Sequence, residues 1–140
     1  MRSYLDSSIV LSKILNQAPQ LSHADWNGIT APFASELIRI ETRRIIERMK
    51  IENHDSEEYF TKTLATLDQM LSGITLVPLQ PRILARAAQP FGLIIGTLDA
   101  LHLSTALALR DQDSTARWTF FTHDQQLKRA ASAVGFAAVG

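Results

Sequence analysis

Short apolar segments that favour strands alternate along this chain with longer segments that favour helices. Residues 117–122 form the clearest strand, and residues 74–79 form a second apolar run between Gly73 and Pro81. Residues 97–109 form an almost entirely apolar helix, which predicts a position deep in the core. Strands that alternate with helices favour a parallel sheet covered by helices on both faces. The expected fold class is therefore α/β.

The remaining elements are predicted from the same patterns and from Gly and Pro as terminators. The expected strands are residues 3–6, 29–31 and 136–139, in addition to the two above. The expected helices are residues 22–27, 33–51, 56–72, 81–88 and 125–134, together with a first helix that begins at Ser7 or Ser8 and ends at Asn16. Pro32 is expected to close the strand 29–31, so that the next helix begins directly after it.

Size and composition narrow the possible functions. The 140 residues suit one domain, spanning residues 1–140, with one hydrophobic core. The 14 basic and 14 acidic residues balance, so nucleic-acid binding would have to come from local patches. The absence of cysteine excludes disulfides, thiolate zinc sites and cysteine nucleophiles. No apolar run is long enough for a signal peptide or a membrane span, so we expect a soluble, cytoplasmic protein.

Two aspartates follow predicted strands. Asp6 ends the first strand, and Asp124 comes two residues after the strand 117–122. The carboxyl ends of parallel strands meet at one edge of a sheet, where ligands bind in α/β proteins. Both aspartates also precede predicted helices, so helix capping is an alternative role for each of them.

Glu41 and Asp99 are acids in apolar surroundings. Glu41 lies four residues after Leu37 and four before Ile45, which places it on the apolar stripe of its helix, whereas Glu36 is predicted to be a solvated charge. Burying a carboxylate costs several kcal/mol unless an arginine or a metal ion compensates it. Asp99 lies in the first turn of the apolar helix, where the helix dipole stabilises a carboxylate by only about 0.3–1 kcal/mol.

Four carboxylates that converge cannot all stay ionised without a cation. Oxygen ligands alone favour Mg²⁺ or Mn²⁺. Such a site can activate a water molecule and neutralise charge on a phosphodiester. The hypothesis is therefore metal-assisted phosphodiester hydrolysis without a protein nucleophile, with Asp6, Glu41, Asp99 and Asp124 as catalytic and metal-binding residues.

Four sequence blocks carry a resemblance to a known family. They are Tyr-Leu-Asp-Ser-Ser at 4–8, Ser-Glu-Leu-Ile-Arg-Ile-Glu at 35–41, Leu-Asp-Ala-Leu-His-Leu-Ser-Thr-Ala at 98–106, and Phe-Thr-His-Asp at 121–124. In this order they resemble the signature blocks of PIN domains, most closely those of VapC-type toxins. The resemblance implies a three-layer α/β/α sandwich around a mostly parallel sheet. It also implies that the four acids bind Mg²⁺ or Mn²⁺, and that Ser8 and Thr122 support the pocket.

The same resemblance implies an endoribonuclease that hydrolyses RNA through a metal-activated water. It further implies the toxin of a type II toxin–antitoxin pair, a homodimer, and a cognate VapB-like antitoxin whose tail occupies the active-site groove. Two alternatives stay open: a non-catalytic PIN-like binding module, and a PIN nuclease in RNA processing. The presence of all four acids argues against the first alternative, and an antitoxin-like gene directly upstream would argue against the second.

Two further features have competing interpretations. A triad of Ser8, His102 and Asp99 is conceivable, but the chain has no Gly-x-Ser-x-Gly elbow. His102 lies three residues after Asp99 on an apolar helix, so a packed or acid-paired histidine is preferred.

The helix 33–51 carries a basic cluster that could contact RNA phosphates: Arg39, Arg43, Arg44, Arg48 and Lys50. The preferred alternative is a solvated face on which these residues pair with Glu36 and Glu47.

Overall fold

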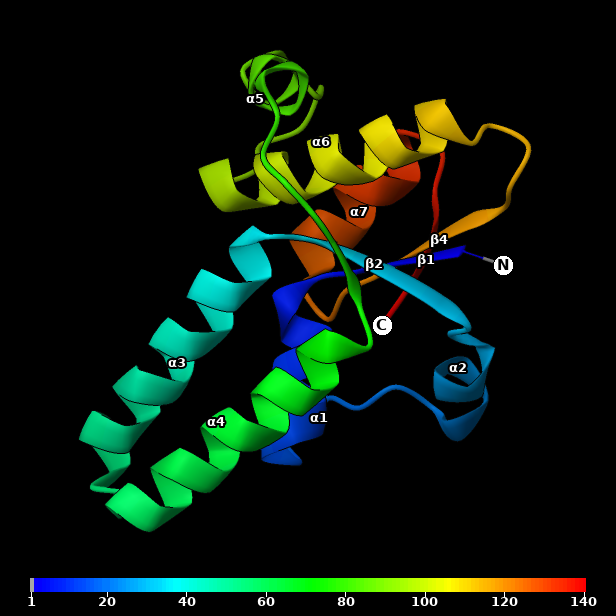
Figure 1. The fold of residues 1–140 in the computed structure, drawn as a ribbon. Helices are drawn as coiled ribbons and strands as arrows, with labels where there is room; N and C mark the ends of the chain where they lie inside the picture. Colours follow the sequence, from blue (N-terminus) through cyan, green and yellow to red (C-terminus); the bar gives the residue numbers. More distant parts are fainter. Residues whose placement is uncertain (1) are drawn as a thin grey trace.

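The computed structural model describes residues 2–140 and has three layers (Figure 1). Its middle layer is a five-stranded sheet in the order β3-β2-β1-β4-β5, in which all neighbouring strands run parallel. The strands are β1 (Arg2–Leu5), β2 (Ala31–Ser35), β3 (Thr75–Val77), β4 (Trp118–Phe121) and β5 (Ala137–Val139). The helices are α1 (Ser7–Leu15), α2 (His23–Gly28), α3 (Leu37–Asn53), α4 (Glu57–Ser72), α5 (Pro81–Ala87), α6 (Thr97–Gln112) and α7 (Gln125–Ala133).

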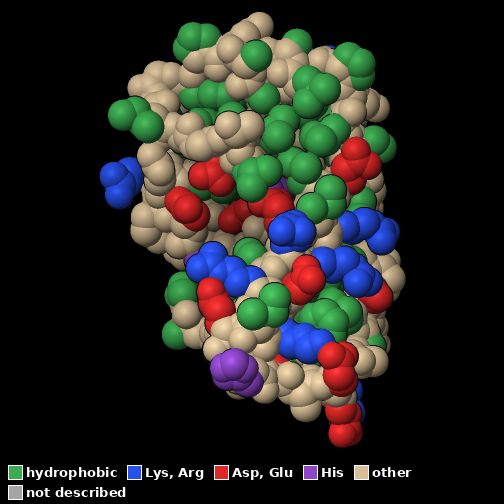
Figure 2. All heavy atoms as spheres, turned by 90° about the vertical axis from the view of Figure 1, so that its left-hand side faces the viewer, with side chains coloured by type: hydrophobic (Ala, Val, Ile, Leu, Met, Phe, Trp, Pro, Cys, Tyr) green, Lys and Arg blue, Asp and Glu red, His purple; other side chains and the backbone are tan. Residues whose placement is uncertain are grey.

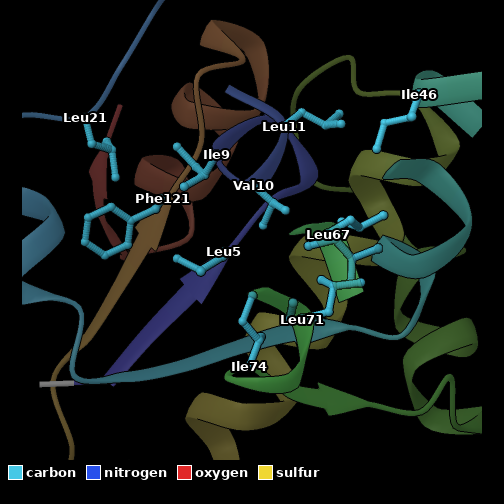
Figure 3. Close-up of a cluster of buried hydrophobic side chains, with 12 residues drawn as sticks. Leu5, Ile9, Val10, Leu11, Leu21, Ile46, Leu67, Leu71, Ile74 and Phe121 are labelled. Atoms are coloured by element: carbon cyan, nitrogen blue, oxygen red, sulfur yellow. The ribbon is translucent and has the colours of Figure 1, made fainter. Parts of the chain in front are cut away.

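Each face of the sheet has its own hydrophobic core, because successive strand residues point to opposite sides. Leu5 and Phe121 belong to the core formed with α1, α3 and α4. In Figure 3, Leu5 lies near Val10 and Leu71, and Phe121 lies near Ile9 and Leu21. Tyr4 and Phe120 face the other way and pack with apolar residues of α6 and α7. Helices thus cover both faces, which confirms the predicted α/β/α sandwich.

The prediction was wrong at β2. Residues 33–35 were expected to begin a helix, but they are strand residues, and α3 begins at Leu37. Pro32, expected to end the strand, lies inside it opposite Ser3 of β1. The other neighbour, β3, pairs with β2 only from Phe33 onward, so one side of Pro32 is open. A residue without an N–H is tolerated at such a position, and proline did not end the strand.

Acidic residues predicted for the site follow the carboxyl ends of the central strands. Leu5 of β1 lies opposite Phe121 of β4, and the Asp6 N–H extends this pairing by donating to the Phe121 carbonyl at 3.0 Å. Asp6 and Thr122 therefore leave adjacent strands at the same edge. The next strand, β2, leads at that edge into α3, which carries Glu41. None of the helices in residues 2–140 is long and apolar enough to cross a bilayer.

Candidate active site

Asp6 is buried at the end of β1 and is held by hydroxyl groups. Its side chain is at the N-cap position of α1 but makes no capping hydrogen bond, so the capping alternative does not apply to it. Instead, Asp6 Oδ2 accepts hydrogen bonds from Ser8 Oγ at 2.7 Å and from Thr122 Oγ1 at 2.9 Å. Asp6 is only 5% exposed, so these donors compensate a carboxylate that has lost most of its water.

Asp124 lies beside this group and does cap a helix. Its carboxylate accepts the Leu127 N–H at 2.9 Å as the N-cap of α7, and its own N–H donates to Thr122 Oγ1 at 3.0 Å. Thr122 therefore links the Asp6 carboxylate to the Asp124 backbone. Asp124 is exposed, and within residues 2–140 only one of its carboxylate oxygens accepts a hydrogen bond, so capping and ligand binding are compatible roles.

Glu41 is mostly buried, and its partner is a histidine rather than the arginine considered from the sequence. His102 of α6 is completely buried, and its Nε2 lies 2.5 Å from Glu41 Oε1 and 3.8 Å from Asp6 Oδ1. The preferred interpretation of His102 as an acid-paired residue is thus confirmed. Burial lowers the pKa of His102, but its hydrogen bond to Glu41 and the nearby charge of Asp6 outweigh this and raise the pKa above its ordinary value.

The pKa of Asp99 depends on the charges of the other three acids. Its pKa is raised from 3.8 to about 6, first by burial and then by the negative charges of Asp124 and Asp6, with a smaller contribution from Glu41. His102 acts in the opposite direction. Carboxylates that raise each other's pKa are destabilised in their ionised form, and a bound cation reverses this effect.

The donor set suits a hard divalent cation, because four carboxylates offer oxygen ligands and excess negative charge. Among residues 2–140, however, no three His, Cys, Asp or Glu side chains are grouped closely enough to hold an ion as they stand. Binding would therefore require at least one carboxylate to change its rotamer. The residues fit the ion by chemistry and charge.

One face of the molecule is hollowed, and acidic side chains gather there (Figure 2). Figure 2 shows the face that carries α3 and the beginning of α6, with Asp and Glu side chains in the middle, Lys and Arg below and hydrophobic side chains above. The exposed Arg44 lies three residues after Glu41, one turn along α3.

The expected pairing of the basic cluster with Glu36 and Glu47 is wrong. Glu36 precedes α3, and its carboxylate accepts the Leu79 N–H at 2.8 Å. Three basic residues of α3 have other partners: Arg43 pairs with Asp68, Arg48 with Glu52, and Lys50 with Glu57. Arg39 and Arg44 have no ion pair in the described part of the chain, so both cations are available to a ligand.

Sequence reasoning did not single out Tyr4. Its hydroxyl lies 2.7 Å from His102 Nδ1 and accepts the Ser35 N–H at 3.1 Å. The sequence did offer a sign of its role, because Tyr4 lies two positions before Asp6 in a predicted buried strand. A tyrosine hydroxyl that is buried usually has a hydrogen-bond partner.

Comparison with known proteins agrees with this architecture. Residues 3–133 match the PIN domain family. The chain belongs to the PIN domain family. No curated protein sequence matches it significantly.

Two solved structures share the fold. One is the crystal structure of VapBC2 from Rickettsia felis bound to a DNA fragment from their promoter, with a TM-score of 0.66 and 18% identity over 99% of this chain and 97% of that one. The other is PAE2754 from Pyrobaculum aerophilum, with a TM-score of 0.63 and 13% identity over 99% of this chain and 83% of that one. At these identities the likeness concerns the fold.

Proposed function

We propose that this PIN domain is an endoribonuclease that depends on Mg²⁺ or Mn²⁺ and acts as the toxin of a type II toxin–antitoxin pair. The observation that carries the proposal is the gathering of four acids at one edge of the sheet. Asp6 and Glu41 both approach His102 Nε2, and burial together with the charges of Asp124 and Asp6 raises the pKa of Asp99 to about 6. A protein gains nothing in stability from such repulsion. Clusters of this kind are typical of functional sites, where a ligand relieves the repulsion.

Asp6, Glu41, Asp99 and Asp124 would hold the cation. When bound, it would lower the pKa of a water molecule and neutralise charge on the scissile phosphodiester. The protein's part is to fix the ligands: Ser8 and Thr122 hold Asp6, and the start of α7 holds Asp124. No side chain in this arrangement is needed as a covalent nucleophile.

RNA as the substrate is supported by exposed basic residues on α3, the helix that carries Glu41. Arg39 and Arg44 are exposed on α3 and have no acidic partner in residues 2–140. Guanidinium groups bind phosphate oxygens through directional hydrogen bonds, and a few of them suffice for an enzyme that binds its substrate transiently. Two such cations would allow a chain whose net charge is zero to bind RNA locally.

The toxin assignment is supported by the likeness in fold, over nearly the whole of both chains, to the VapBC2 structure. A VapB-like antitoxin would be the cognate partner, and the setting would be the cytoplasm. A homodimer is part of the proposal because the resemblance to VapC-type toxins implies one.

Incubation of the purified protein with total RNA tests the proposal. We expect cleavage with Mg²⁺ or Mn²⁺, none with EDTA, and discrete ends when the cut sites are mapped. Asp6→Asn and Asp99→Asn should each lower the cleavage rate by more than about 100-fold while keeping the circular dichroism spectrum, because they remove charge and keep shape. Full cleavage by either variant would contradict the mechanism.

Expression in cells tests the biological role separately. The chain alone should arrest growth, and co-expression of the product of a small upstream gene should restore it. Metal-dependent cleavage in vitro together with normal growth would favour the alternative of a PIN nuclease in RNA processing.

One observation favours a second candidate, a non-catalytic PIN-like binding module. The Nε2 atom of His102 already lies against Glu41 and near Asp6, so an imidazolium could neutralise part of the cluster without an ion. Metal-independent RNA binding without cleavage would support this candidate.

A further inference from the structure

A buried chain of hydrogen bonds runs from the sheet to Glu41. It joins three elements, because Tyr4 lies in β1, His102 in α6 and Glu41 in α3. Tyr4 Oη lies 2.7 Å from His102 Nδ1, and His102 Nε2 lies 2.5 Å from Glu41 Oε1. Tyr4 and His102 are both 0% exposed, and the Glu41 side chain is 14% exposed. Water therefore does not compete for the inner two groups.

The direction of these hydrogen bonds follows from what each atom can donate. The Ser35 N–H donates to Tyr4 Oη, so the Tyr4 hydroxyl has its own proton to give. Of its neighbours, Thr105 and His102, we assign His102 Nδ1, at 2.7 Å, as the acceptor. A tyrosine hydroxyl keeps its proton at neutral pH, so this proton stays in place. With Nδ1 accepting, Nε2 carries the imidazole hydrogen and donates to Glu41.

The donation to Glu41 does not depend on the charge of His102. In the neutral form just described, Nε2 carries the hydrogen, and in the imidazolium form both ring nitrogens carry one. Glu41 Oε1 therefore accepts a hydrogen bond in either state, and Oε2 keeps both of its lone pairs for a ligand. Because Tyr4 and its partner Ser35 are fixed in adjacent strands, the orientation of the imidazole ring is set by the sheet.

We propose that Tyr4 and His102 are positioning residues that orient the Glu41 carboxylate toward the divalent cation. This inference rests on the proposed metal-dependent function. Carboxylate ligands of metal sites are commonly hydrogen-bonded to such outer partners, and losing a partner typically lowers metal affinity or activity by about 10–100-fold. Without His102, the Glu41 side chain would sample several rotamers, and the ion would have to select one of them.

Mn²⁺ binding in the absence of RNA tests the proposal, with free Mn²⁺ measured by electron paramagnetic resonance. His102→Leu removes the donor and should raise the dissociation constant about 10–100-fold. His102→Gln supplies an amide N–H that can donate to Glu41 and should recover most of the affinity. Tyr4→Phe keeps the ring, does not touch Glu41, and should weaken binding by an intermediate factor.

Ser104→Ala is the matched control. Ser104 lies on the same helix as His102, is 1% exposed, and its hydroxyl has no hydrogen-bond partner in the described residues. This variant should bind Mn²⁺ like the wild type. Circular dichroism and thermal unfolding establish which variants fold.

The outcomes separate this inference from the proposed function. If the wild type binds Mn²⁺ and folded His102→Leu and Tyr4→Phe bind it equally well, the inference is overturned and the proposed function stands. If His102→Leu does not fold, the test rests on Tyr4→Phe. Wild-type affinity for Mn²⁺ in Tyr4→Phe then overturns the inference. A wild-type protein that binds no Mn²⁺ overturns both.

Discussion

Asp99→Asn should stabilise the metal-free protein at neutral pH while removing its activity. In the folded chain the pKa of Asp99 is raised from 3.8 to about 6, by burial first and then by Asp124 and Asp6. Above pH 6 the ionised carboxylate therefore opposes folding. Asparagine has nearly the same shape and no charge, so it removes this opposition.

The size of the effect can be worked out from the pKa. A change from 3.8 to about 6 corresponds to about 3 kcal/mol. Asp99 is only partly buried, and solvent screening reduces this figure to about 1–2 kcal/mol. Its carboxylate lies in the first turn of α6, and losing the interaction with the helix dipole costs about 0.3–1 kcal/mol. The net gain is about 1 kcal/mol, or roughly 3 °C in Tm for a domain of this size.

The pH dependence has a definite sign. The pKa is higher in the folded chain, so the folded state binds more protons between about pH 4 and pH 6. In the wild type, ionisation of Asp99 therefore lowers the free energy of unfolding as the pH rises from about 4 to about 6. Below about pH 4, Asp99 is protonated in both states and has no such effect. The variant lacks this decline, so the difference between variant and wild type should widen over this range and then stay constant.

Urea unfolding in EDTA at pH 4.5 and pH 7.5 measures this difference. Glu36→Gln is the control, because Glu36 is an exposed acid at the start of α3 and its amide can still accept the Leu79 N–H. An Asp99→Asn protein no more stable than the wild type at pH 7.5 would refute the reasoning. So would a gain that is equal at both pH values.

Three further predictions concern other parts of the site. Glu41→Gln should lose RNA cleavage and Glu36→Gln should keep it, as measured by cleavage of a defined oligoribonucleotide; the reverse ranking would mean that the wrong glutamate was assigned. Thr122→Val should lower the free energy of unfolding by about 1–3 kcal/mol in urea, because it removes the donor to Asp6 at unchanged size; an unchanged midpoint would show that this hydrogen bond is not stabilising. Arg44→Gln should raise KM for RNA several-fold, leave kcat unchanged and flatten the salt dependence of binding, whereas an identical salt slope would exclude a phosphate contact.

The fold was largely predictable because its patterns are local. The buried strand 118–121 and the apolar helix α6 are identified by their hydrophobicity alone, and their alternation with the other elements indicates a parallel sheet. The error at β2 has a physical cause that lies outside the segment. Pro32 is compatible with a strand only because β3 starts to pair one residue later, and this information belongs to the tertiary structure.

The site was predictable as a set of acids but not as a network. Strand ends gave Asp6 and Asp124, and helical spacing gave Glu41 and Asp99. The contact of Tyr4 with His102 joins residues 98 positions apart, and no local pattern specifies such a pair. The pairing of Glu41 with His102 likewise depends on how α3 and α6 approach each other beside the sheet.

A crystal of the protein soaked in Mn²⁺, with diffraction data collected at the manganese absorption edge, is the most direct examination of the acidic cluster. We predict one anomalous peak or a close pair of peaks in contact with the carboxylates of Asp6, Glu41 and Asp99. A map with no peak there, or with Mn²⁺ bound only at other surface carboxylates, would contradict the view that these side chains form a cation site.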